Sequence, residues 1–177
     1  KFNLKITFQE YKNFTGLPFK IIMEKLGLSK IDEEIKNLYF SETKKRSKKI
    51  KLIKGAEEII NYLHKKNYLI SIITSKPRKS YNTMKNLIPK NVKTVLCSDD
   101  TEFNKPDKKL IKYLLSKYPN RESNLTYVGD TIFDLQFSIN SNMNFIHFSD
   151  FKKNKLPKNL ANKIRAVDSL LEVKELV

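Results

Sequence analysis

Residues 125–134, with the sequence LTYVGDTIFD, contain the pattern that decides the fold. A short apolar run leads to Gly129 and Asp130, and Asp134 follows about one helical turn later. An apolar strand that ends in a small residue and a carboxylate is typical of the edge at which open parallel sheets bind ligands. Two carboxylates that meet there supply the hard oxygen ligands that Mg²⁺ prefers. Taken alone, the stretch fits a magnesium-phosphate site and a plain tight turn before a helix equally well.

From Gly55 onward, predicted helices and strands alternate. The strands are expected at residues 68–73, 94–97, 125–128 and 144–148, and the helices at 56–63, 81–87, 108–118, 132–139 and near Leu170. The run at 68–73 is almost entirely apolar, which predicts a strand buried on both faces. This alternation predicts an α/β fold with a Rossmann-like parallel sheet flanked by helices.

The first 51 residues are predicted to be helical. The markers of helix ends are a capping box at Thr7 and Glu10, Pro18 and Gly27 around a second helix, and a third helical run over residues 32–45. Apolar residues alternate with polar ones over residues 2–8, so a strand is the alternative there. The capping box favours a short lead-in followed by a helix.

Charge and composition limit the classes of partner. The chain has 177 residues, the length of one domain or of a domain with a small appendage, and a formal net charge of +16. Almost all of its cations are lysines, and the arginines are Arg46, Arg78, Arg121 and Arg165. Base readout and bidentate phosphate binding favour arginine. The dense cationic group at residues 44–51 is expected to be a solvated helix end. We therefore expect no nucleic-acid partner, although the positive field attracts anionic substrates.

Membrane and zinc-binding classes are not indicated either. No apolar run reaches the length that crosses a bilayer, and no secretory signal opens the sequence. Cys97 is the single cysteine, and His64 and His147 are isolated from each other. The sequence therefore predicts no disulfide framework, no zinc site and no membrane partner, and it indicates a cytoplasmic protein.

Two further groups of polar residues follow predicted strands. Thr74 ends the run at 68–73 and is followed by Ser75 and Lys76 before a predicted helix. A hydroxyl and free amide groups at a helix start form an anion site, and a simple N-cap is the plainer interpretation. Lys105, in the sequence Lys-Pro-Asp, follows the strand at 94–97 and precedes a helix, so its ammonium group can point to the same edge of the sheet.

These three groups, in this order and spacing, resemble the haloacid dehalogenase-like hydrolase superfamily. The similarity is strongest to its phosphoglycolate-phosphatase and β-phosphoglucomutase-like branch, and it covers essentially the whole chain. The stretch TGLP at residues 15–18 is similar to the inserted helical cap of that branch. The resemblance implies a helical cap domain at residues 1–51 and a Rossmann-like core domain at residues 52–177.

The resemblance also implies a chemistry, namely Mg²⁺-dependent hydrolysis of a small phosphorylated metabolite through an aspartyl-phosphate. It assigns catalytic roles to Thr74, Lys105 and Asp130, phosphate or substrate binding to Thr74, Ser75 and Lys76, and the metal to Asp130 and Asp134. Asp134 would assist as a ligand or hold the lysine. Lys20, one turn past Pro18, is a candidate contact for an anionic substrate.

One part of the family pattern has no counterpart here. The family's nucleophile and its acid/base partner lie in an Asp-x-Asp-Gly-Thr motif on the first, central strand, and the pair Asp99-Asp100 lies elsewhere. We therefore expect a further segment of roughly 25–30 residues, enough for one strand and a helix, to precede Lys1. Without it the chain is expected to be poorly stable and to turn nothing over. The alternatives are an inactive family member that binds or regulates, and a phosphosugar mutase. The substrate and the oligomeric state are not predicted.

Overall fold

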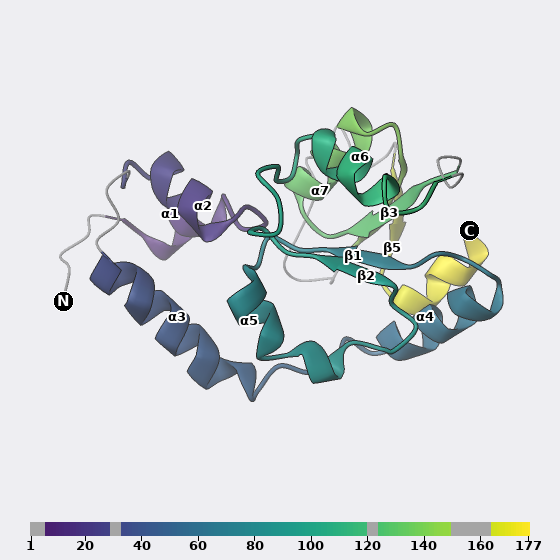
Figure 1. Cartoon of the computed structure of the whole chain (residues 1–177), viewed down its shortest axis with the longest axis horizontal. Coiled ribbons are helices and arrows are strands. Elements are labelled where there is room, and N and C mark those ends of the chain that lie inside the picture. The colour runs from purple at the N-terminus through teal and green to yellow at the C-terminus, as the bar shows by residue number, and fades with distance from the viewer. Residues whose placement is uncertain (1–5, 29–32, 120–123, 150–163) are drawn as a thin grey trace.

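Parallel strands with helices on both sides form the body of the molecule (Figure 1). The computed structural model describes residues 6–28, 33–119, 124–149 and 164–177. Its strands are β1 (Ser71–Ile73), β2 (Thr94–Leu96), β3 (Thr126–Gly129), β4 (Asn144–Phe148) and β5 (Arg165–Val167). Every paired strand runs parallel to its neighbour. The predicted α/β class with a parallel sheet is confirmed.

The N-terminal part of the described chain is helical, with α1 (Phe8–Lys12), α2 (Phe19–Lys25) and α3 (Glu33–Ser47). The predicted capping box begins α1, since the Thr7 side chain accepts a hydrogen bond from the Glu10 amide at 3.2 Å and the Glu10 carboxylate accepts one from the Thr7 amide at 2.7 Å. The alternative strand falls mostly on residues 1–5, which lie outside the described residues. A small buried cluster of Leu17, Ile22 and Met23 holds α2 in place.

Two hydrophobic clusters cover the two faces of the strands. On one side lie α6 (Lys109–Leu115) and α7 (Ile132–Asn140), whose cluster contains Leu96, Leu110, Ile111, Leu114 and Phe137. On the other side lie α4 (Ala56–Lys65) and the 3₁₀-helix η2 (Leu170–Glu175), whose cluster contains Ile59, Ile146, Val167 and Val173. Figure 1 shows this division, with α6 and α7 above the strands and α4 below them. None of the described helices is long and apolar enough to cross a membrane.

The strands form two separate sheets, of order β1-β2 and β3-β4-β5. Among the described residues no ladder joins β1 to β3. A hollow of about 390 Å³ lies beside both strands and is lined in part by Ser71, Ile73, Thr126 and Tyr127.

Several predicted elements differ in extent. The strand predicted at 68–73 is reduced to β1, and Tyr68 and Leu69 are 45% and 37% exposed because one side of this run is open. The helix predicted at 81–87 is replaced by α5 (Arg78–Asn82) and the 3₁₀-helix η1 (Lys85–Leu87). The last predicted helix is the 3₁₀-helix η2, and β5 was not predicted because its run is only three residues long.

Candidate functional site

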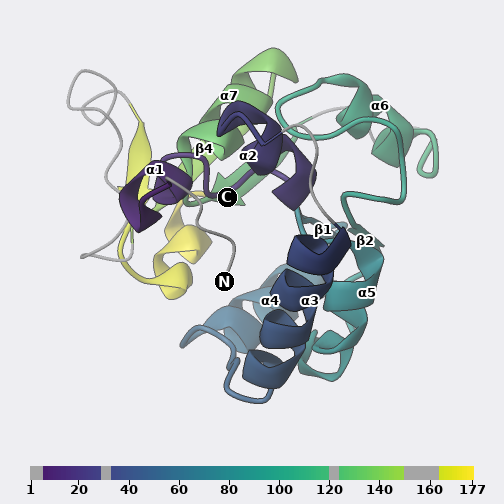
Figure 2. The same ribbon diagram turned by 90° about the vertical axis from the view of Figure 1, so that its left-hand side faces the viewer.

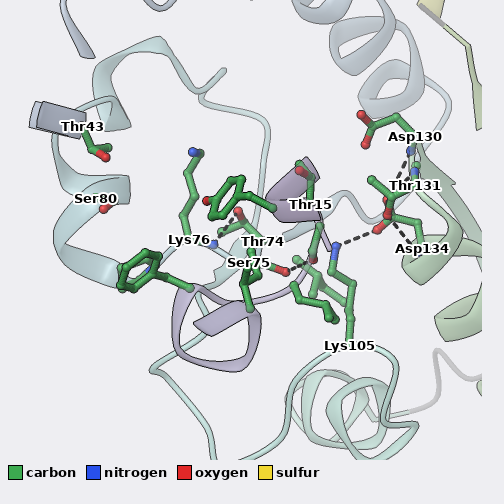
Figure 3. Close-up of a pocket in the computed structure, with 18 of the residues that line it drawn as sticks. Thr15, Thr43, Thr74, Ser75, Lys76, Ser80, Lys105, Asp130, Thr131 and Asp134 are labelled. Carbon is green, nitrogen blue, oxygen red and sulfur yellow. Dashed lines mark hydrogen bonds and ion pairs between the residues drawn. The ribbon is translucent and has the colours of Figure 1, made fainter. Parts of the chain in front are cut away.

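A cavity of about 400 Å³ opens where β1 and β3 end, next to the N-terminal helices. Figure 3 shows part of its lining. Six of the seven predicted site residues line this cavity, namely Thr74, Ser75, Lys76, Lys105, Asp130 and Asp134. The seventh, Lys20, does not line it: its side chain is 83% exposed, and its Nζ lies 3.9 Å from Oε1 of Glu24.

The loop after β1 carries Thr74 into the cavity. The Thr74 amide donates to the carbonyl of Leu96 at 2.9 Å, which extends the pairing of β1 with β2 by one residue. The Thr74 hydroxyl oxygen accepts a hydrogen bond from the Lys76 amide at 3.2 Å. The amide of Arg78 donates to Asp99 at 2.7 Å. The sequence predicted free amide groups at this helix start that could bind an anion. Two of them, the amides of Lys76 and Arg78, instead donate hydrogen bonds to side chains of the protein.

Arg78 and Asp100 clamp the loops that follow β1 and β2. The Arg78 guanidinium contacts both carboxylate oxygens of Asp100, with Nε 3.1 Å from Oδ1, and it also donates to the Val95 carbonyl at 2.8 Å. The second carboxylate oxygen accepts the Cys97 amide at 2.7 Å. Although burial opposes ionisation, the Arg78 guanidinium holds the pKa of Asp100 below its ordinary value. The clamp fixes the loop of Thr74 against the loop that leads to Lys105.

Replacing Arg78 with lysine is expected to lower the free energy of unfolding by about 1 kcal/mol, because lysine keeps the charge and loses the planar fork. The loss stays small since the Arg78 side chain is 37% exposed and solvent screens the pair. Urea denaturation measures the change. The matched control is Arg46→Lys on the exposed part of α3. Equal effects of the two substitutions would show that the clamp does not stabilise the fold.

Lys105 is held inside the cavity wall by a buried carboxylate. Its side chain is only 8% exposed, and its Nζ lies 2.6 Å from Oδ1 of Asp134. The Tyr127 hydroxyl donates to the same oxygen at 3.2 Å and lies 3.3 Å from the Lys105 ammonium. Burial raises the pKa of the Tyr127 phenol, and the Asp134 charge raises it further, so this hydroxyl keeps its proton.

The second oxygen of Asp134 is also occupied. It accepts hydrogen bonds from the Thr131 hydroxyl at 2.7 Å, the Thr131 amide at 3.0 Å and the Asp130 amide at 3.2 Å. Although burial opposes ionisation, the charge and hydrogen bond of Lys105 and the bonds from Thr131 keep the pKa of Asp134 low. Both oxygens are therefore used within the protein. The resemblance implies that Asp134 either binds the metal or holds Lys105. In the structure its carboxylate contacts Lys105.

Gly129 allows β3 and α7 to approach closely enough for this arrangement. A Cβ atom at Gly129 would lie 2.5 Å from the Cβ and 2.7 Å from the carboxyl carbon of Asp134. Real Cβ atoms essentially never come that close to another heavy atom. The glycine is thus required by close packing against the carboxylate that holds Lys105.

Asp130 is the candidate metal ligand on the exposed part of the cavity lining. It lies on the loop after β3, at the cavity lining and exposed, and Figure 3 shows it next to Thr131. Among the described residues, His, Cys, Asp and Glu form no group of three or more that could hold a metal. Mg²⁺ usually binds one or two carboxylates, several waters and substrate phosphate oxygens. Asp130 fits that kind of partial protein site because its exposed carboxylate lies on the cavity lining.

The N-terminal helices close the other side of the cavity with aromatic and hydroxyl groups. Tyr11, Phe19, Ile22, Tyr39 and Thr43 line it there. The rings of Phe19 and Tyr39 are stacked with centroids 4.0 Å apart. Burial raises the pKa of the Tyr11 phenol, and the neighbouring Tyr39 adds to this shift. The Tyr11 phenol therefore keeps its proton and can form neutral hydrogen bonds in the cavity.

Three contacts fasten these helices to the strand region. The Ser75 hydroxyl donates to the carbonyl of Gly16. Gly16 has a φ of +110°, and a Cβ there would lie 2.8 Å from the Thr131 hydroxyl oxygen. Phe133 of α7 packs against the cluster of Leu17 and its neighbours. Figure 2 accordingly shows α2 beside α7.

Some of the residues that build the cavity were not predicted from the sequence. Thr131 had a recognisable pattern, since threonine followed three residues later by Asp134 is a form of capping box, and the structure confirms that box. No sequence pattern marked Tyr127, Phe19 or Tyr39 as site residues, because aromatic residues in strands and helices are ordinary core residues.

Comparisons with known proteins show which family and which folds the chain is similar to. A family model described as haloacid dehalogenase-like hydrolase matches residues 1–148. In the comparison with curated proteins, nothing matches the chain. Among solved structures, a hydrolase from Pseudomonas syringae is 18% identical with a TM-score of 0.79, and the match covers 98% of this chain and 84% of that one.

Two further solved structures are similar in fold. A predicted phosphoglycolate phosphatase from Haemophilus somnus is 15% identical with a TM-score of 0.74, over 98% of this chain and 84% of that one. A phosphonoacetaldehyde hydrolase-like protein from Oleispira antarctica is 12% identical with a TM-score of 0.73, over 98% of this chain and 79% of that one. At these identities the similarity shows a shared fold.

Proposed function

Because the chain belongs to the haloacid dehalogenase-like hydrolase family, we propose that it acts as a Mg²⁺-dependent phosphatase on a small phosphorylated metabolite in the cytoplasm. The observation that carries the proposal is the meeting of Thr74, Lys105 and Asp130 at one cavity, with Lys105 fixed by Asp134. A hydroxyl, a buried ammonium group and a carboxylate at the end of parallel strands are suited to bind and polarise a phosphate monoester.

Each of these side chains has a distinct task in the proposed reaction. The Thr74 hydroxyl and the Lys76 ammonium group bind oxygens of the phosphoryl group. Lys105 neutralises the charge that spreads over these oxygens during transfer. Asp130 would hold Mg²⁺, which when bound supplies further charge neutralisation and orients the phosphate. Asp134 positions Lys105, because its Oδ1 lies 2.6 Å from the ammonium nitrogen.

The proposed reaction runs through an aspartyl-phosphate, with the first aspartate of the family's Asp-x-Asp motif as the nucleophile. Its carboxylate oxygen attacks phosphorus, the ester P–O bond breaks, and the alcohol leaves with a proton from the second aspartate of that motif. Water then hydrolyses the aspartyl-phosphate. The helices of residues 1–51 act as the cap that excludes bulk water during these steps.

The native protein, purified from its own cells, is expected to hydrolyse phenyl phosphate with Mg²⁺ and to lose this activity with a chelator. Asp130→Asn removes the proposed metal ligand, and kcat/KM should fall by about 100-fold or more because several kcal/mol of charge stabilisation are lost. The control is Asp107→Asn, whose exposed carboxylate accepts a hydrogen bond from the Lys109 amide.

The outcome separates the alternatives as well. Binding of phosphate monoesters without turnover in the native protein would favour an inactive binding protein. Return of the phosphoryl group to a different hydroxyl of a sugar phosphate, in place of release as inorganic phosphate, would favour a mutase.

A further inference from the structure

In the part of the chain that the structure describes, the cavity wall that faces the strands carries charged side chains and the wall formed by the helices carries none. The strand side contributes two cations, Lys76 and Lys105, and two carboxylates, Asp130 and Asp134. The helix side contributes three rings, two aliphatic side chains and two threonine hydroxyls, from Tyr11, Phe19, Tyr39, Leu17, Ile22, Thr15 and Thr43. Among the described lining residues, none from α1, α2 or α3 is charged.

The uncharged wall is notable in a chain with a net charge of +16. Lysines of the same helices point elsewhere. Lys20 and Lys36 line a separate hollow, and Lys36 pairs with Glu33 at 3.0 Å in an exposed contact. The described lysines of these helices therefore lie away from this wall.

Among the described lining residues, Lys76 and Lys105 are the cations, and a bound phosphate would leave neither of them for a second anionic group. The two lysines and two carboxylates balance each other, and Lys105 is already paired with Asp134 at 2.6 Å. A phosphate dianion would be compensated by Lys76, Lys105 and the proposed Mg²⁺. A carboxylate on the leaving group would have to be buried against rings and hydroxyls without a partner, which is costly.

The aromatic side chains of this wall pack against one another. The rings of Phe19 and Tyr39 are stacked with centroids 4.0 Å apart and an interplanar angle of 17°, and the rings of Tyr39 and Phe40 meet edge to face with centroids 5.4 Å apart. Rigid rings offer a flat face on which a ring of the ligand can lie, and the phenols and threonines offer hydrogen bonds to its hydroxyl groups. In the view of Figure 3, Thr43 and Ser80 lie across the cavity from Asp130 and Thr131.

We propose that the substrate is a phosphate monoester of an uncharged alcohol that carries a ring, and that the wall of Phe19, Tyr39 and Thr43 selects against a carboxylate on the leaving group. This inference rests on the proposed phosphatase function and deepens it. It separates the chain from any phosphatase whose substrate carries a carboxylate, such as phosphoglycolate.

The test compares substrates that differ in one group. Phenyl phosphate and 4-carboxyphenyl phosphate share the ring and the ester, and ethyl phosphate and phosphoglycolate are the matched pair without a ring. With the native protein, kcat/KM is expected to be about tenfold or more higher for the uncharged member of each pair, because the carboxylate is buried without a partner. Phenyl phosphate should also exceed ethyl phosphate.

A gain-of-function variant tests the same wall without depending on a loss of activity. Thr43→Lys places a cation on the helix side of the cavity and is expected to raise kcat/KM for 4-carboxyphenyl phosphate by about tenfold relative to phenyl phosphate. Asn37→Lys adds the same charge at an exposed position of α3 and should leave the ratio unchanged. An unchanged ratio in Thr43→Lys would overturn the assignment of this wall.

Failure of the inference and failure of the proposed function give different results. Turnover that favours phosphoglycolate or 4-carboxyphenyl phosphate keeps the phosphatase and overturns the inference. If no ester is hydrolysed, the proposed function fails. Thermal-shift titrations of the native protein with the two phenyl esters then test the inference about the uncharged wall by binding alone. Tighter binding of phenyl phosphate supports the uncharged wall, and equal or tighter binding of the carboxylated ester overturns it.

Discussion

Replacing Asp134 with asparagine lowers the free energy of unfolding by about 3–5 kcal/mol, the usual effect of removing one partner from a buried ion pair. The reason is geometric, since Lys105 is 8% exposed and its ammonium nitrogen lies 2.6 Å from the carboxylate that the substitution neutralises. The cation then remains buried beside a neutral amide. Urea denaturation of the two proteins at neutral pH measures the difference.

The control for this substitution is Glu102→Gln, which neutralises an exposed carboxylate and should change stability by less than about 0.5 kcal/mol. The double substitution Lys105→Met with Asp134→Leu removes both charges and is expected to be more stable than Asp134→Asn alone, because no unpaired buried charge remains. A double variant no more stable than the single one would show that the ion pair does not explain the loss.

The same pair gives the stability of the protein a defined pH dependence. Asp134 has a pKa below its ordinary 3.8 in the folded state. A depressed carboxyl pKa stabilises the fold fully at pH values above the unfolded value, and the contribution is lost as pH falls through the folded value. The gap between the native protein and Asp134→Asn should therefore be constant near neutral pH and shrink as the pH drops below about 4. A gap that grows on acidification would contradict this linkage.

Much of the strand side of the site could be predicted because its residues follow local patterns. Thr74, Lys105 and Asp130 each come soon after an apolar run, and parallel strands end at the same edge of a sheet. Order along the chain was therefore enough to expect them at one cavity. The resemblance implies two roles for Asp134, as a metal ligand or as the partner of Lys105, and spacing along the chain does not distinguish them.

The helix side of the cavity could not be predicted in the same way. Phe19 and Tyr39 look like ordinary aromatic positions of helices, and only the fold, which brings α2 and α3 to the cavity at the ends of β1 and β3, places them there. Lys20 was predicted to contact the substrate and does not line the cavity. A lysine one turn after Pro18 can lie on either side of its helix, and the side chain of Lys20 is exposed to solvent. Such orientations depend on long-range packing and not on spacing along the chain.

Replacing Gly129 with alanine is expected to lower the free energy of unfolding by about 2–3 kcal/mol and to reduce phosphatase activity of the native protein by about 100-fold. The added methyl group would lie 2.5 Å from the Cβ of Asp134, so either β3 or α7 must move. Asp134 cannot give way cheaply, because its carboxylate is bonded to Lys105 and Thr131. Denaturation and kinetic assays of the same preparations measure both effects.

Gly27→Ala is the matched control, because it makes the same chemical change at a glycine with φ of +77° and nothing within 4 Å of the added atom. That variant bears backbone strain without a clash, and we expect it to lose about 1 kcal/mol with little change in kcat. A Gly129→Ala protein that is as active as Gly27→Ala would mean that β3 can move without displacing Lys105. Loss of activity with stability like that of the control would instead locate the damage at the Lys105–Asp134 pair, since a small shift of a catalytic group reduces the rate far more than it reduces stability.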